Sequence, residues 1–279
     1  MFRQITIIGT GLIGGSVGLA VKKHGLARNI VGCDRADILE KAKRAGAIDA
    51  GDPDPVTASR GSDVAVLATP VGGILDLLEK LGPVLPKDAL LTDVGSTKLQ
   101  IAERARKIFG SDWQARFLPG HPMAGKEKSG IEHADAELFR DAVWIFTSEP
   151  GSPRQGAFVS LAEAIGASPL FLDAERHDRI CAWVSHLQQF VSTAMASALV
   201  DVQADLGPEV HAIGGRALRE MTRIASSPYS MWRDIAFTNS ANIESALSAL
   251  EQNLAHIREN LKTPGLREEF RKANSFRSK

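Results

Sequence analysis

Short apolar runs alternate with amphipathic segments over the first 172 residues of the chain. The apolar runs predict strands, and the amphipathic segments between them predict helices. The predicted strands are residues 4–9, 30–34, 63–68, 89–93, 116–118, 142–147 and 168–172. The predicted helices are residues 39–45, 74–81, 98–108 and 154–165. This alternation favours a parallel, doubly wound α/β sheet.

The pattern changes after residue 173. From residue 175 to residue 261, almost every segment has helical periodicity and no strand-like run stands out. We therefore expect two domains, an α/β domain over residues 1–173 and an all-α domain over residues 174–279. A chain of 279 residues is long enough for both domains to bury a core.

Composition and charge narrow the class of protein. Hydrophobic residues make up 44% of the chain and charged residues 24%, as in ordinary globular proteins. Lys plus Arg equals Asp plus Glu at 33 each, so no global field attracts nucleic acid or a membrane surface. No apolar run has the length of a membrane span, and the N-terminus lacks a signal-peptide pattern. Cys33 and Cys181 form neither a disulfide framework nor a metal-ligand spacing, which predicts a cytoplasmic protein without a metal site.

A glycine-rich loop joins the first predicted strand to an apolar helix. The stretch "IIGTGLIGGSVGLAV" has G-x-G-x-x-G spacing in the context that a dinucleotide-binding loop requires. The first glycine permits a tight turn, the second lets the backbone approach a pyrophosphate, and the third allows close helix packing. The alternative is a glycine-rich turn without a ligand. The residues predicted to bind the cofactor here are Gly9, Gly11, Leu12, Ile13 and Gly14.

An acidic residue follows the second predicted strand, twenty residues after the loop. Asp34 stands where a carboxylate would accept hydrogen bonds from the adenosine ribose and repel a 2′-phosphate. Arg35 beside it could bind that phosphate or stack on adenine. We therefore expect NAD, with NADP less favoured. Thr69 and Pro70 follow another strand, which predicts that they lie at the same cofactor-binding edge.

A histidine lies in the glycine- and proline-rich stretch "FLPGHPMAGKEKSG". His121 comes just after a predicted strand, hence at the edge where open α/β sheets bind ligands. A neutral imidazole there could take a proton from an alcohol while hydride leaves the carbon. The alternative is a histidine that only pins its own loop. Ser96, after the strand at residues 89–93, is the natural hydroxyl to orient His121, although such serines often only cap a helix.

Polar residues of the helical domain form two possible faces. Asp178, Ser185 and Gln189 fall nearly on one line of a helix, with His177 and His186 on either side of it. Such a seam can also be a solvated face.

The second face joins Arg216, Arg219 and Arg223, which share one side if the segment is helical. They could clamp a carboxylate or pair with surface acids such as Glu220.

Five motifs together resemble the prephenate dehydrogenase family, which includes arogenate and cyclohexadienyl dehydrogenases. They are the GTGLIGGS loop, DVGSTK at 93–98, HPMAGKEKSG at 121–130, HDR…SHL at 177–187 and TRIASSPYSMWRDI at 222–235. The resemblance covers nearly the whole chain. It implies a Rossmann-type domain followed by a helical dimerisation domain that intertwines in a homodimer. It also implies oxidative decarboxylation of prephenate to 4-hydroxyphenylpyruvate, or of arogenate to tyrosine, with NAD or NADP.

The resemblance also implies roles for single residues. His121 would be the catalytic group and Ser96 its orienting hydroxyl, while Arg223 would bind a substrate carboxylate. Ser185 and His186 would line the pocket.

Trp232 would reach the site from the partner subunit. The chain departs from many bacterial members at Gln189, where they carry a histidine, and at residues 215–217. Both departures lie where the substrate side chain should bind.

Three functions follow from these features. We expect NAD-dependent prephenate dehydrogenation in tyrosine biosynthesis, and arogenate as the alternative substrate. Arg216 and Arg219 would favour prephenate, the more anionic of the two, if they face the pocket. A third possible function, of a non-enzymatic class, is a dimer that senses the dinucleotide without catalysis. This function assigns no task to His121, Ser96 and Arg223.

Overall fold

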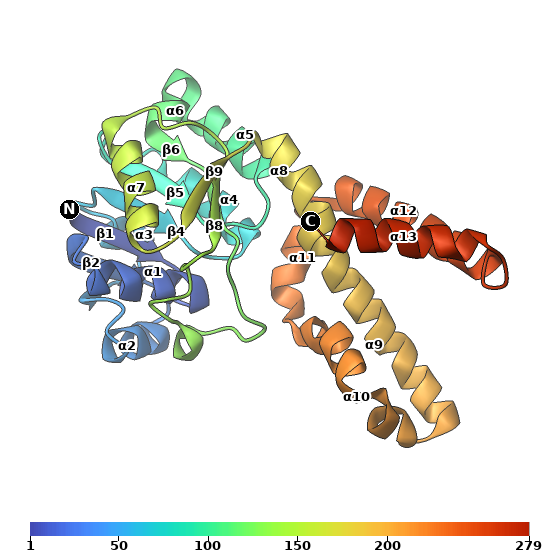
Figure 1. Ribbon diagram of the computed structural model, residues 1–279. Coiled ribbons are helices and arrows are strands. Elements are labelled where there is room, and N and C mark those ends of the chain that lie inside the picture. The colour runs from blue at the N-terminus through green and yellow to red at the C-terminus, as the bar shows by residue number, and fades with distance from the viewer. Residues whose placement is uncertain (279) are drawn as a thin grey trace.

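The computed structural model describes residues 1–278 and has an α/β part and a helical part (Figure 1). The parallel sheet has six strands in the order β3-β2-β1-β4-β5-β6. They are β1 (Phe2–Ile8), β2 (Ala27–Cys33), β3 (Ala50–Gly51), β4 (Val64–Leu67), β5 (Leu90–Asp93) and β6 (Phe117–Leu118). The order reverses between β1 and β4, which is the switch point where doubly wound sheets bind ligands.

Helices cover both faces of this sheet because successive strand residues point to opposite sides. Ile5 and Ile7 of β1 belong to one buried cluster, whereas Ile8 belongs to the cluster on the other face. The helices of this part are α1 (Leu12–Lys23), α2 (Ala36–Arg44), α3 (Pro55–Ala58), α4 (Val71–Leu81), α5 (Leu99–Phe109), η1 (Gly110–Asp112) and α6 (Trp113–Arg116).

Two predicted strands form a second sheet instead of extending the first. The segments expected at 142–147 and 168–172 become β8 (Val143–Phe146) and β9 (Ser168–Phe171), and β7 (Gly120–Pro122) pairs antiparallel with β8. The turn η2 (Ile131–His133) and helix α7 (Pro153–Ala164) complete this part. The predicted parallel, doubly wound sheet is confirmed, but the predicted strands at 142–147 and 168–172 lie outside it because the chain leaves the first sheet after Leu118.

The helical part extends away from the sheets (Figure 1). Helix α8 (Ala174–Cys181) continues through a π-helical turn, η3 (Ala182–His186), into the long helix α9 (Leu187–Leu206). The remaining helices are α10 (Glu209–Thr222), η4 (Arg223–Ser226), α11 (Tyr229–Thr238), α12 (Ser240–Glu259) and α13 (Gly265–Arg277). Each helix within residues 1–278 is too short or too polar to cross a membrane.

Candidate functional site

A cavity of about 580 Å³ lies where the sheet edge meets the helical part. Its wall is made by loops after β5 and β7, by the η3–α9 segment and by η4 and α11. Segments more than 130 residues apart in the sequence meet here. Six of the residues predicted for catalysis or substrate binding line this cavity: Ser96, His121, Ser185, Gln189, Arg223 and Trp232.

A second cavity of about 270 Å³ adjoins the first at the glycine loop. Leu12, Ile13 and Ser96 line both cavities. Gly11, Thr69 and Pro70 line only the second, so the predicted cofactor residues from two strand ends meet there. The arrangement places a nucleotide site beside the cavity that contains His121.

The glycine loop has the shape that a pyrophosphate requires. Gly9 has φ of +94°, a left-handed conformation that disfavours a side chain, and a Cβ at Gly14 would overlap the Gly9 carbonyl. A Cβ at Gly11 would meet no atom within 4 Å, which leaves open space beside the N-terminus of α1. The N–H groups of the first helical turn point into that space and favour an anion.

Asp34 is held against the same loop. Its Oδ2 accepts hydrogen bonds from the backbone N of Thr10 at 2.8 Å and from Thr10 Oγ1 at 3.2 Å. The guanidinium of Arg35 instead turns to the Asp37 carboxylate at 3.2 Å, on the protein surface. The carboxylate therefore lies by the loop, while the arginine charge is partly neutralised away from it.

His121 is an almost buried side chain on β7. Its Nδ1 lies 2.9 Å from His177 Nε2, so Nε2 is the ring nitrogen left to face the cavity. Burial, with the charges of His177, Lys98 and His186, lowers the pKa of His121 well below its ordinary 6.5. The imidazole is therefore neutral and able to accept a proton at neutral pH. The side chain in hydrogen-bond contact with His121 is His177, whereas Ser96, to which the sequence prediction gave the orienting role, shares the cavity wall with His121.

A buried ion pair fixes the backbone next to His121. The Lys98 ammonium contacts the Asp93 carboxylate and donates to the Gly120 carbonyl at 2.8 Å. Asp93 Oδ1 in turn accepts from the Gly120 N at 3.2 Å. Both side chains are fully buried. Burial raises the pKa of Asp93 and lowers the pKa of Lys98, and the attraction between the two charges opposes both shifts.

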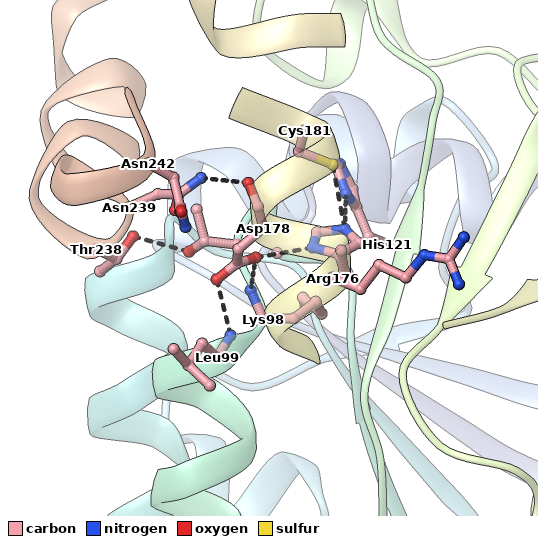
Figure 2. A network of polar contacts seen from close by, with 12 residues as sticks. Lys98, Leu99, His121, Arg176, Asp178, Cys181, Thr238, Asn239 and Asn242 are labelled. Atoms are coloured by element: carbon pink, nitrogen blue, oxygen red, sulfur yellow. Dashed lines mark hydrogen bonds and ion pairs between the residues drawn. The ribbon is translucent and has the colours of Figure 1, made fainter. Parts of the chain in front are cut away.

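The helical line of polar residues that begins at Asp178 is buried at its start, where Asp178 is 1% exposed. The alternative interpretation as a solvated face is therefore wrong for this residue. Figure 2 shows Asp178 between the start of α5 and the end of α11. Its carboxylate accepts from the backbone N atoms of Lys98 at 2.7 Å and Leu99 at 2.9 Å. The Asp178 carbonyl accepts from Asn239 Nδ2 at 2.8 Å. Asp178 thus connects the two parts of the protein.

His121, His177 and Cys181 form a cluster that sequence spacing did not reveal. Their donor atoms lie within 4.8 Å of one another, a distance compatible with a metal ion. Burial, with Asp178 nearby, raises the pKa of the Cys181 thiol to about 12, so the sulfur keeps its proton. His177 Nε2 is occupied by the contact with His121, and Cys181 Sγ lies 3.4 Å from the same nitrogen. These contacts describe a hydrogen-bonded cluster.

His186 and Trp232 are both placed differently from the expectation that the family resemblance gave. His186 is buried behind the cavity wall, packed against the Trp232 ring with centroids 6.1 Å apart, and burial lowers its pKa to about 4. Trp232 was expected from a partner subunit, but it lines the cavity of its own chain. The reason is the turn after η4, which brings α11 back over η3.

The three arginines predicted on one face separate. Arg216 pairs with Glu220 at 2.6 Å on the surface, and Arg219 lines a groove between α9 and α10. Gly215, with φ of +59°, kinks α10, and Arg223 lies beyond the helix in η4. Only Arg223 lines the main cavity, where it contacts the Glu127 carboxylate. The condition under which Arg216 and Arg219 would favour prephenate is therefore not met.

A nucleotide loop beside a cavity with a buried, neutral histidine is the site of a two-domain, nucleotide-dependent dehydrogenase. Residues 17–167 match the family model of the prephenate dehydrogenase nucleotide-binding domain, and residues 173–273 match that of the prephenate dehydrogenase dimerization domain. The chain belongs to the prephenate dehydrogenase family.

Relatives agree with this assignment. The chain is 35% identical to a prephenate dehydrogenase of Lactococcus lactis over 92% of its own length and 70% of the relative's length. It is similar to the crystal structure of an A. aeolicus prephenate dehydrogenase in complex with hydroxyphenyl propionate and NAD+, with TM-score 0.83 and 30% identity, covering 100% and 96% of the chains. A Synechocystis arogenate dehydrogenase matches with TM-score 0.79 and 28% identity over 99% of each chain.

Proposed function

We propose that the protein catalyses the NAD-dependent oxidative decarboxylation of prephenate to 4-hydroxyphenylpyruvate. The observation that carries the proposal is the position of His121. Its Nε2 faces a cavity that shares Leu12, Ile13 and Ser96 with the nucleotide site, so a hydroxyl placed there would lie beside the nicotinamide. The non-catalytic sensor interpretation gives no reason for a neutral buried base in that place.

The proton and the electrons balance in the proposed reaction. NAD, held by the glycine loop and Asp34, would supply the acceptor for the hydride that leaves C4 of the substrate. His121 Nε2 takes the proton of the C4 hydroxyl. The bond between C1 and the ring carboxylate breaks, its electron pair enters the ring and carbon dioxide leaves. The ring becomes aromatic, and His121 returns its proton to the phenolate oxygen.

Arg223 is the residue that we propose to bind a substrate carboxylate. Its guanidinium lines the cavity and contacts Glu127 from the loop after β7. A substrate carboxylate would exchange with Glu127 at this cation, because both present the same pair of oxygens. Trp232 Nε1 has no hydrogen-bond partner within residues 1–278, and we propose that it donates to the same substrate.

The direct test is NADH formation by the purified protein with NAD and prephenate, together with product analysis for 4-hydroxyphenylpyruvate and carbon dioxide. Turnover with stoichiometric formation of the three products supports the proposal. Tight NAD binding without turnover on prephenate or arogenate would instead favour the sensor.

We expect the Asp34→Ser variant to relax discrimination against NADP. The carboxylate beside the glycine loop repels a 2′-phosphate and accepts hydrogen bonds from the ribose, so its loss should raise kcat/KM for NADP and lower it for NAD. The ratio of the two constants should change by about tenfold or more, which is about 1.4 kcal/mol. Glu40→Ser removes one negative charge from the exposed side of α2 and is the control. A wild-type preference for NADP would contradict the proposed role of Asp34.

Arogenate is the second candidate substrate, and Gln189 favours it. Gln189 Nε2 donates to the Ile224 carbonyl at 2.9 Å and to Thr193 Oγ1 at 3.2 Å. Both amide protons are therefore used inside the protein, and the oxygen is the atom left for a ligand. An acceptor suits the ammonium of arogenate, whereas the keto group of prephenate requires a donor.

The Gln189→Met variant separates the two substrates. Methionine keeps the approximate volume but has no amide oxygen, so kcat/KM for arogenate should fall about tenfold more than kcat/KM for prephenate. Gln188→Met, on the exposed neighbour that also lines the cavity, is the control and should leave the ratio unchanged. Equal losses on the two substrates would show that Gln189 does not contact the side chain that distinguishes them.

We also propose that the helical domain forms a homodimer. We place the start of this domain at residue 174, because Asp173 caps α8 by accepting a hydrogen bond from the Arg176 N. Its own buried cluster is small, with Ala182, Ile235 and Ile243 at the centre. Large apolar side chains remain exposed on the domain, among them Val200, Leu206, Ile213, Phe237 and Phe276. A domain with more apolar helix face than it can cover requires a partner.

Light scattering at micromolar concentration should therefore give twice the chain mass of 29.9 kDa. The Ile213→Glu variant places a charge on a residue that is 82% exposed, and it should shift the equilibrium towards monomer without unfolding the α/β domain. A fully active wild-type monomer would contradict the proposal.

A further inference from the structure

We propose that His177, held by Asp178, is the positioning residue that fixes the tautomer of His121 and leaves Nε2 of His121 free to accept the substrate proton. The inference rests on the proposed role of His121 as the base. His177 touches neither cavity, so it would act only through His121.

The arrangement begins with an immobile carboxylate. Asp178 is 1% exposed, and its Oδ1 accepts from Lys98 N while its Oδ2 accepts from Leu99 N. These donors are backbone amides at the start of α5, so they can only donate. The carboxylate therefore has a fixed orientation before it meets the histidine (Figure 2).

The carboxylate determines the tautomer of His177. His177 Nδ1 lies 2.8 Å from Asp178 Oδ1, and an oxygen that already accepts from an amide requires a donor at that position. Nδ1 of His177 therefore carries the proton. In the neutral ring, Nε2 then has the lone pair and is an acceptor.

The tautomer of His121 follows by the same rule. His177 Nε2 accepts, so His121 Nδ1 at 2.9 Å must donate. Nε2 of His121 consequently has its lone pair directed at the cavity, which is the state that a general base needs. With the opposite tautomer, Nε2 would carry a proton and could not accept one from the substrate.

The surrounding groups are consistent with this state. The titratable side chains nearest to His121 are His177, Lys98 and His186, and the Lys98 ammonium is paired with Asp93. The Cys181 thiol lies 3.4 Å from the same Nε2 of His177 and is a weak donor, so the one lone pair of that nitrogen is taken by the shorter contact from His121 Nδ1. When His121 takes the substrate proton, the bond from its Nδ1 to His177 becomes charge-assisted and stronger.

The first experiment reads the tautomer in the wild-type protein without substrate. Long-range ¹H–¹⁵N spectra of histidine-labelled protein distinguish Nδ1–H from Nε2–H, and the signal lost in His121→Asn identifies His121 among the seven histidines. We expect the Nδ1–H tautomer at His121 and at His177. An Nε2–H tautomer at His121 would overturn the proposal whatever the activity is.

The second experiment uses variants of His177. His177→Phe removes the acceptor, and we expect kcat to fall about 10²-fold, with KM for NAD unchanged and with the His121 tautomer shifted to Nε2–H. His177→Gln can accept again through its side-chain oxygen and should recover about tenfold of that loss. Cys181→Ala perturbs the same packing without touching the tautomer, so it reports the effect of packing alone.

The outcomes separate this inference from the proposed function. His177→Phe within a few-fold of wild type, with His121→Asn inactive, would overturn the positioning role and leave His121 as the base. If both variants are active, the role of His121 fails as well. Stoichiometric zinc in the purified protein would also overturn the proposal, since a metal would take the nitrogen lone pairs that the hydrogen bonds require.

Discussion

The His121→Asn variant should lose about 10²-fold or more of kcat with prephenate, the size of effect expected when a general base is removed. Affinity for NAD should hardly change, because the contacts of the glycine loop and Asp34 do not include this side chain. Initial rates over a range of substrate concentrations, together with an NAD titration, measure the two quantities separately.

The pH dependence of the wild type adds a second measurement to this prediction. The neutral imidazole is the active form, so protonation of His121 stops the reaction. Burial is the main cause that lowers the pKa of His121 well below 6.5. We therefore expect kcat/KM to be constant from neutral pH down through 6.5, and to fall only at more acid pH, where His121 becomes protonated. A rate that halves near 6.5 or above would mean that another group controls activity.

The control is His24→Asn, which changes an exposed histidine at the end of α1. This variant should match the wild type in both kcat and NAD affinity. His121→Asn within a few-fold of wild-type kcat would remove His121 from the mechanism, and the proposed function would then need another base.

The sequence predicted most of the first sheet because strand signals there are local. Short apolar runs such as Ile5, Ile7 and Ile8 are visible without knowledge of their partners, and six of the seven predicted strand segments contain at least four strand residues in the structure. β3 and β7 have two and three residues, too short to give a periodic signal. The separate second sheet depends on which strands pair, and pairing cannot be read from periodicity.

The nucleotide loop could be predicted for the same reason. All its determinants lie within a few residues, since the glycines create both the turn and the open space for phosphate. The orientation of His121 could not be predicted in this way, because it depends on His177, which is 56 residues away in the sequence. His177 in turn is held by Asp178, whose carboxylate accepts from the backbone of Lys98, 80 positions away. The helical line through Asp178 was visible, but its burial against α5 was not.

The prediction that Arg216, Arg219 and Arg223 share one helix face was wrong because of a local kink that the sequence pattern does not reveal. Three arginines at helical spacing share one side only if the helix is continuous, and Gly215 interrupts it with a positive φ. Glycine in a helical pattern is compatible with a kink or with a straight helix, so the pattern alone could not choose.

The Lys98→Met variant should lose about 3–5 kcal/mol of unfolding free energy, the range measured when one partner of a buried ion pair is removed. Lys98 and Asp93 are both 0% exposed, so the substitution leaves the Asp93 carboxylate without a countercharge in the interior. It also removes the donor to the Gly120 carbonyl, next to His121. Urea unfolding at one fixed protein concentration measures the loss, since association with a partner contributes to stability.

A double variant distinguishes the uncompensated charge from simple loss of packing. Asp93→Asn combined with Lys98→Met removes both charges and should recover part of the stability lost by Lys98→Met alone, because no unpaired charge stays buried. Lys80→Met breaks a surface pair with Asp54 whose side chains are about half exposed, so it should change the unfolding free energy far less than Lys98→Met does. A Lys98→Met loss as small as that of Lys80→Met would mean that Asp93 is neutral in the folded protein. The pair would then hold Gly120 by hydrogen bonds rather than by charge.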